Sequence, residues 1–257
     1  MRKRRIGTAK FFTLLLLLYH TSANLPGLQP DIIRIAKESG KPVIVVLLAG
    51  SAMALSWEDE HVDAILDGFY PGAQGGAAIA EILFGGANPE GKLPITFYQT
   101  TEELPEFTDY AMKGRTYRYM ENEALYPFGY GLSYTTYAYG NLECVKPFDA
   151  QDGITLQVTV TNTGDREGTE TLQVYVKAKR EGTPNPQLKY VKKITLKPGE
   201  SVTEEIHLSP EAFMLYDEKG NFTLEKGAYD IFVGGCQPDA RSAALTGNAP
   251  QKLTVTY

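Results

Sequence analysis

Ile154-Thr-Leu-Gln-Val-Thr-Val-Thr161 and Glu170-Thr-Leu-Gln-Val-Tyr-Val-Lys177 decide the fold of the C-terminal half of this 257-residue chain. Apolar and polar residues alternate in both stretches, which is typical of strands with one buried and one exposed face. Asn162-Thr-Gly-Asp165 lies between them and predicts a turn. The sequence therefore predicts two half-buried strands joined by that turn.

Further short strands follow the same pattern. Lys197-Pro-Gly-Glu200 predicts a hairpin turn between two of them. The remaining predicted strands are Tyr190–Leu196, Ser201–Leu208, Asn221–Glu225, Tyr229–Val233 and Lys252–Tyr257. About seven alternating strands with regular turns predict an immunoglobulin-like or fibronectin-type β-sandwich over residues 141–257.

Residues 99–140, which precede this sandwich, form a predicted linker with many aromatic residues. Aromatic rings with polar tips, next to arginines, are typical of sugar-binding rims. Arg115, Tyr117 and Tyr119 are therefore the candidate substrate-binding residues. Packing of the loop against a neighbouring domain is the alternative, and it is favoured for residues 126–134.

Residues 24–98 follow a different period. Pro30 to Glu38 predicts a helix with Ile32, Ile33, Ile35 and Ala36 on one face, and Val43–Leu48 predicts a strand covered on both faces, as in a parallel sheet. A second strand (62–70), a helix of small residues (75–84) and a third strand (93–98) follow. This order predicts half of an αβα sandwich, so the fold class is α/β followed by all-β. No strand precedes Val43–Leu48 among residues 24–42, which leaves an apolar sheet edge open.

Residues 1–23 have a composition of their own. They contain a basic head, an apolar run of about eight residues and small residues for cleavage, as in a secretory signal peptide. The run is too short to span a bilayer, so no membrane segment is predicted. A segment foreign to the fold is the alternative. The chain is secreted under the first interpretation and cytoplasmic under the second.

Charge and composition exclude several classes of function. Residues 1–23 hold five of the 25 basic residues and no acidic one, so residues 24–257 carry 20 basic and 31 acidic residues, a net charge of −11. Such a chain repels phosphate backbones, and nucleic acid is not an expected partner. Cys144 and Cys236 are too few for a cysteine-rich zinc site, although they could pair. His61 and His207 are expected on solvated faces, and no cofactor or metal is expected.

Several stretches resemble glycoside hydrolase family three. The C-terminal stretches resemble its fibronectin type III-like domain, and the others its second, αβα domain and the segment that follows. Lys113–Tyr119 resembles the branch that contains β-xylosidases and related β-glucosidases. The matching stretches are Leu25–Gln29, Gly40–Leu48, Tyr70–Gly72 with Gly75-Gly76, Asn88–Pro94, Leu125–Thr135, Thr161–Gly164, Gln173–Tyr175 and Leu196–Glu200.

This resemblance implies exo-acting, retaining hydrolysis of β-linked glucosides or xylosides, which needs two carboxyl groups about 5 Å apart. In the family, the nucleophilic aspartate lies in an N-terminal barrel, and the acid/base glutamate lies shortly before the Leu-Pro-Gly stretch. Residues 11–23 occupy that place here and contain neither Asp nor Glu. No catalytic residue is therefore assigned. The remaining acidic clusters, at residues 58–60, 102–103 and 121–123, are expected on solvated faces.

Three hypotheses follow for the chain. The first is a C-terminal fragment of an exo-acting retaining β-glycosidase, inactive alone because it lacks the barrel. The second is a non-catalytic module that binds β-linked oligosaccharides through the aromatic linker. The third is one subunit of a split glycosidase that a separate barrel completes.

Overall fold

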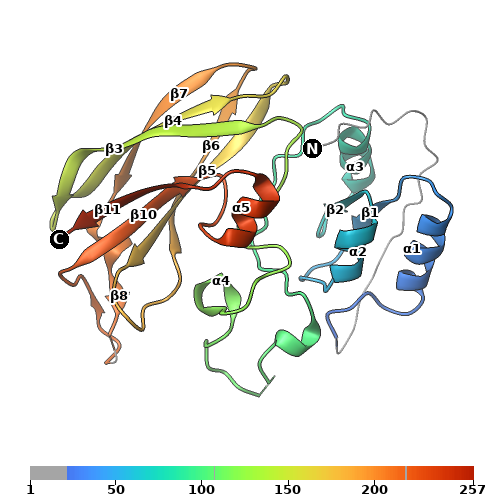
Figure 1. Cartoon of the computed structure of the whole chain (residues 1–257), viewed down its shortest axis with the longest axis horizontal. Helices are drawn as coiled ribbons and strands as arrows, with labels where there is room; N and C mark the ends of the chain where they lie inside the picture. Colours follow the sequence, from blue (N-terminus) through green and yellow to red (C-terminus); the bar gives the residue numbers. More distant parts are fainter. Residues whose placement is uncertain (1–21, 107, 218) are drawn as a thin grey trace. The chain divides into compact units, whose positions relative to one another are not determined.

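The computed structural model describes residues 22–106, 108–217 and 219–257 (Figure 1). The signal-like segment predicted at 1–23 lies almost wholly outside the described residues. Contacts divide the chain into two compact units. Unit 1 comprises Met1–Ala87 and Phe97–Tyr110, and unit 2 comprises Asn88–Thr96 and Ala111–Tyr257. The domain limits expected from the sequence remain predictions.

Unit 1 contains the predicted α/β pattern. Its elements are α1 (Gln29–Glu38), β1 (Ile44–Leu47), α2 (Ser56–His61), β2 (Ala64–Asp67), α3 (Gly75–Leu83) and the short 3₁₀ turn η1 (Thr101–Glu103). Strands β1 and β2 pair in parallel, with Ile44 opposite Ala64 and Leu47 opposite Asp67. The β–α–β order and the parallel pairing confirm the α/β class expected from the apolar runs.

Helix α1 shows how local sequence sets an element. Pro30 lies in its first turn, where a missing backbone N–H costs nothing, and Ser39 ends the helix by donating its hydroxyl to Ala36 O at 2.6 Å. Gly40 follows with φ +68°, a left-handed conformation that glycine adopts without strain. Of the four apolar residues expected on one buried face, only Ile33 is buried.

The third strand predicted over residues 93–98 is not formed. Leu93 instead joins unit 2, where its N–H donates to Tyr130 O and its carbonyl accepts from Gly129 N, both at 2.8 Å. Pro94 cannot donate to a sheet ladder, and Phe97 belongs to the other unit. The apolar run is therefore divided between the two units, and its composition does not predict that division.

Unit 2 contains a β-sandwich. One sheet has the order β11-β10-β5-β6 and the other β3-β4-β7, while β8 and β9 form a separate hairpin (Figure 1). All pairings in these sheets are antiparallel. The strands are β3 (Tyr137–Asp149), β4 (Gly153–Asn162), β5 (Gly168–Ala178), β6 (Gln187–Leu196), β7 (Ser201–Leu208), β8 (Leu215–Tyr216), β9 (Phe222–Thr223), β10 (Ala228–Gly234) and β11 (Gln251–Thr256).

The alternating stretches build the sandwich core. Ile154, Leu156, Val158 and Val160 of β4 are completely buried, and the polar residues between them face outward. They pack in one cluster with Leu172, Val174 and Val176 of β5. Because β4 and β5 belong to different sheets, the turn at residues 162–165 carries the chain from one layer to the other. The fibronectin-type sandwich expected from the sequence is confirmed.

Three further elements of unit 2 were not predicted. Strand β3 begins at Tyr137, inside the expected linker, and helix α5 (Ala240–Thr246) follows β10. A 3₁₀ turn, η2 (Pro210–Phe213), precedes β8. The side chain of Asp239 caps α5 by accepting the Ser242 N–H at 2.8 Å, and Gly247 closes the helix with φ +69°. An Asp and a Gly eight residues apart were the signal that could have identified this helix.

Candidate functional site

The predicted substrate-binding residues lie together in unit 2, in and beside the one-turn helix α4 (Thr116–Tyr119). Gly114 and Thr116 both have left-handed φ angles, +72° and +55°. For a β-branched residue such as Thr116 that conformation is unusual, and backbone strain of this kind is concentrated at ligand-binding positions. The turn closes through Gly114 N–H, which donates to Tyr119 O at 3.1 Å.

Tyr117 is packed against the sandwich. Its ring stacks on Phe128 at 4.2 Å and meets the edge of Tyr175 at 6.3 Å. Its hydroxyl accepts the Leu188 N–H at 3.2 Å. One face and the polar tip of Tyr117 are therefore occupied within unit 2, so this residue anchors α4 whatever else it contacts.

Arg115 and Tyr119 flank that anchor, and both side chains are partly exposed. The Nε of Arg115 donates to Ala111 O at 3.1 Å. Asn185, in the loop between β5 and β6, donates through Nδ2 to the carbonyls of Tyr117 and Met120 at 3.1 and 2.8 Å. The loop thus holds the carbonyl end of α4 and fixes the turn that carries Arg115 and Tyr119.

The aromatic stretch after α4 covers the outer face of β5. Gln173 donates through Nε2 to Gly129 O and Gly235 O, both at 3.0 Å, and Tyr175 donates its hydroxyl to Gln173 Oε1 at 2.6 Å. A side chain on Gly129 would strike both Gln173 and Tyr175. Packing therefore accounts for this part of the stretch, as expected for residues 126–134.

Residues 88–96 form a strap along unit 2 that was not predicted from the sequence. Asn88 Oδ1 accepts from Ser133 Oγ at 3.1 Å and from Tyr134 N at 2.8 Å. Glu90 accepts the Thr169 N–H at 2.9 Å, and Lys92 donates to Gly131 O at 2.9 Å. The Asn-Pro-Glu-Gly-Lys motif was visible in the sequence, but nothing in it indicated which unit it would join.

Lys92 also forms an ion pair with the buried Glu170 carboxylate. Its Nζ lies 3.5 Å from Glu170 Oε1. Burial raises the pKa of Glu170, and the Lys92 ammonium opposes that rise. Burial, followed by the neighbouring Glu170 carboxylate, also raises the pKa values of the Tyr137 and Tyr139 hydroxyls. Glu170 is thus a buried ion-pair partner in the sandwich.

The acidic clusters of the sequence analysis lie mostly as expected. Glu121 and Glu123 are exposed, and Glu103 accepts the Gln99 N–H at 2.9 Å. Glu58 is the exception, because it is buried within α2. The expectation of a solvated face is therefore wrong for that residue: Glu58 lies on the inner side of a short helix whose outer residues are polar.

The other buried carboxylates are paired with lysines. Glu204 lies 2.5 Å from Lys192, and Asp230 lies 2.8 Å from Lys252. Asp230 is desolvated, yet its bonds to Lys252 and Thr254 prevail and lower its pKa. Asp230 therefore does not resemble a general acid, which needs a raised pKa.

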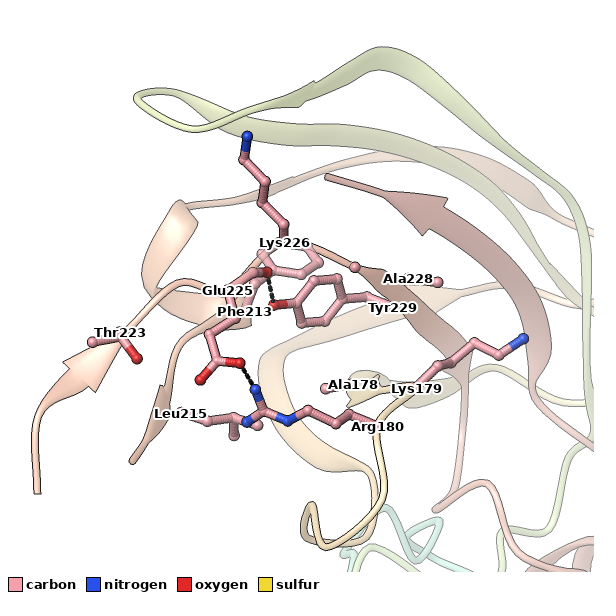
Figure 2. A pocket seen from close by; sticks show the side chains of 11 residues that line it. Ala178, Lys179, Arg180, Phe213, Leu215, Thr223, Glu225, Lys226, Ala228 and Tyr229 are labelled. Carbon is pink, nitrogen blue, oxygen red and sulfur yellow. Dashed lines mark hydrogen bonds and ion pairs between the residues drawn. The ribbon is translucent and has the colours of Figure 1, made fainter. Parts of the chain in front are cut away.

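A cavity of ≈190 Å³ lies in unit 2, lined by residues of the β8–β9 hairpin and of the strands β5 and β10 (Figure 2). Phe213, Leu215 and Tyr229 supply its apolar surface. Glu225 is the single carboxylate of the lining; it pairs with Arg180, and its backbone oxygen accepts the Tyr229 hydroxyl at 2.6 Å. One paired carboxylate cannot perform retaining glycoside hydrolysis, which needs two facing ones.

The histidines and cysteines can be compared with what the sequence suggested. His61 and His207 are exposed, as predicted, and Cys144 and Cys236 are both free thiols, so the pairing left open is not made. Over residues 22–106, 108–217 and 219–257, no group of three or more His, Cys, Asp or Glu could hold a metal ion. No helix in those ranges is long and apolar enough to cross a membrane.

Comparison with known proteins gives consistent matches. Residues 18–134 match the profile of the glycosyl hydrolase family 3 C-terminal domain, and residues 170–237 match a fibronectin type III-like domain. A xylan 1,4-β-xylosidase from Xylanibacter ruminicola is 42% identical over 88% of this chain and 26% of its own length. A periplasmic β-glucosidase from Salmonella typhimurium is 39% identical over 83% of this chain and 30% of its own.

A solved structure agrees with these matches. A β-glucosidase from Erythrobacter marinus superposes with a TM-score of 0.76 at 34% identity, over 91% of this chain and 30% of that one. The chain therefore spans about a third or less of the length of these relatives.

Proposed function

Because this chain belongs to glycosyl hydrolase family 3, we propose that it serves an exo-acting, retaining β-glycosidase that acts on β-linked glucosides or xylosides. In this proposal the chain supplies the C-terminal part of the enzyme, and a barrel that it does not span supplies the rest. The observation that carries the proposal is the 42% identity to a β-xylosidase over 88% of the chain but only 26% of the relative.

Catalysis in this proposal does not come from the chain itself. Glu170, Glu204 and Asp230 are buried in the sandwich and paired with lysines, and the cavity near β8 and β9 contains one paired carboxylate. None of these groups forms the facing pair of carboxyls that retention requires. The isolated chain is accordingly proposed to be inactive, with nucleophile and acid/base both supplied by the part of the enzyme that precedes residue 24.

The contribution of the chain to substrate binding is proposed to come from α4 and its flanks. Arg115 and Tyr119 are partly exposed on a strained turn, and Tyr117 holds that turn on the sandwich. A guanidinium and a phenol hydroxyl can bind sugar hydroxyls, and a tyrosine ring can stack on the C–H face of a sugar. A β-linked oligosaccharide is therefore the proposed ligand, and nucleic acid and membranes are not proposed partners.

A chimera tests the proposal. The segment of the Xylanibacter ruminicola enzyme that aligns with residues 24–257 is replaced by those residues, so that the relative supplies everything before Asn24. We expect the chimera to hydrolyse aryl β-xylosides or aryl β-glucosides and the isolated chain to hydrolyse neither. A folded but inactive chimera would contradict the proposal. So would turnover by the isolated chain that is lost when one of its own carboxylates is changed.

A second candidate is a non-catalytic module that binds oligosaccharides, favoured by the strained turn that presents Arg115 and Tyr119. Titration of the isolated chain with xylo- and cello-oligosaccharides tests it. Saturable binding that Tyr119→Ala and Arg115→Ala weaken would support this candidate. Tyr117→Ala is a poor probe, because its loss also removes the packing on Phe128. A split enzyme completed by a separate barrel remains a third candidate, and activity gained only on co-expression with that barrel would identify it.

A further inference from the structure

Helix α1 of unit 1 exposes an apolar stripe to solvent. Leu28, its N-cap, is 72% exposed, Ile32 43% and Ile35 65%. With 3.6 residues per turn, these three positions lie within about 60° of one another around the helix axis. Scattered exposed apolar residues are ordinary, but an aligned row on one helix face marks an interaction surface.

The other sides of α1 are already in use within unit 1. Ile33 is buried, Arg34 lies over the Trp57 ring at 5.3 Å, and Lys37 pairs with Asp63 at 2.9 Å. These contacts fix the rotation of the helix about its axis. The stripe formed by Leu28, Ile32 and Ile35 therefore cannot turn inward to join the core of unit 1.

The sheet beside α1 is also incomplete in the part of the chain that the structure describes. There, β1 and β2 are four residues each and have only one another as neighbours. Parallel sheets are stable when they have more strands and helices on both faces. Phe84, directly after α3, is another large apolar residue left mostly exposed.

We propose that the α1 stripe is the surface on which the remaining, N-terminal part of a family 3 enzyme packs with apolar side chains of its own. The inference rests on the proposed function. The matched relatives supply the candidate occupant, because they carry about 70% of their own length beyond the matched region.

The test places the same substitutions in two contexts. Ile35→Asp and Leu28→Asp are placed in the isolated chain and in the chimera described above, with Glu38→Lys as the matched control on an exposed polar position of the same helix. In the isolated chain we expect all three to leave the melting temperature unchanged. In the chimera we expect the two Asp variants to lower it by about 5 °C or more, because they bury an unpaired charge, while the control does not.

Equal effects of Ile35→Asp in both contexts would overturn the proposal. Concentration-dependent dimerisation of the isolated chain that Ile35→Asp abolishes, measured by sedimentation, would assign the stripe to a second copy instead and also overturn it. The readout is thermal unfolding, so it is separate from turnover. If the chimera is inactive but Ile35→Asp still destabilises it and not the isolated chain, the proposed function is contradicted. The assignment of the α1 stripe as a packing surface is then still supported.

Discussion

At the scale of single residues, the Lys92–Glu170 pair is a buried ion pair of unit 2. The two side chains are 14% and 6% exposed and lie 3.5 Å apart. Removing one partner of a buried ion pair leaves an uncompensated charge and costs about 3–5 kcal/mol. Lys92 is also the residue that fastens the strap, through its bond to Gly131 O.

We expect Lys92→Met to lower the free energy of unfolding by about 3 kcal/mol at pH 7, and by less as the pH falls toward 4.5. The pKa of Glu170 is raised in the folded chain above its ordinary value of 4.5. Between those two values the folded state binds more protons than the unfolded state, so the contribution of Glu170 to stability grows on acidification. Loss of the Lys92 ammonium raises the pKa of Glu170 in the folded chain further, so stability increases more steeply on acidification in Lys92→Met. Urea unfolding at several pH values measures the free energy of unfolding of both proteins.

Two controls accompany this prediction. Lys37→Met removes a half-exposed pair with Asp63 and should cost no more than about 1 kcal/mol at any of these pH values. Lys92→Met combined with Glu170→Gln should lose the pH dependence that Lys92→Met shows alone. If Lys92→Met costs the same at pH 4.5 and pH 7, the account of Glu170 as a buried, charged partner of Lys92 is wrong.

At the scale of elements, α4 is a single turn that cannot be stable by itself. Its position depends on Asn185, which binds the carbonyls of Tyr117 and Met120 and donates its own N–H to Arg118 O at 2.8 Å. The sequence placed Arg115, Tyr117 and Tyr119 close together. The contact with a loop 65 or more residues away decides how they are presented.

Asn185→Ala should lower the free energy of unfolding by about 1–3 kcal/mol, because two hydrogen bonds to α4 are lost. Hydrogen exchange should accelerate at the amides of Gly114 and Met120, which close the turn, and remain unchanged along β4. Gln151→Ala, in the exposed turn between β3 and β4, is the matched control and should alter neither quantity. Unchanged exchange at Gly114 and Met120 in Asn185→Ala would show that α4 is held by other contacts.

At the scale of the whole molecule, the two compact units predict two unfolding transitions. Leu55 of unit 1 and Leu172 of unit 2 are both completely buried. Each Leu→Ala substitution should cost about 2–5 kcal/mol in its own unit. By calorimetry, Leu55→Ala should therefore lower one melting temperature and Leu172→Ala the other. A single transition that both substitutions shift equally would contradict this division of the chain.

Much of this organisation could be predicted from sequence. The alternation in residues 154–161 decided the sandwich, because a period of two gives a strand one buried face. Residues 170–177 alternate in the same way, but β5 is buried on both faces, because the segment that contains Gly129 covers its outer one. The unbroken run Val43–Leu48 decided the parallel α/β unit, because only a strand covered on both faces is apolar throughout. The motifs that resemble family 3 indicated the family, since a motif depends on which residues are present and in what order.

Tertiary structure alone decided the rest, because it concerns which distant residues meet. The run at 93–98 reads as a strand, yet its backbone joins Gly129 and Tyr130. Glu58 reads as one acid in a solvated cluster, yet it is buried. Ile32, Ile33 and Ile35 share the apolar face that the sequence predicts, yet only Ile33 is buried. The spacing of apolar residues predicts which side of a helix or strand is apolar. Only the packing of other elements determines whether that side is buried.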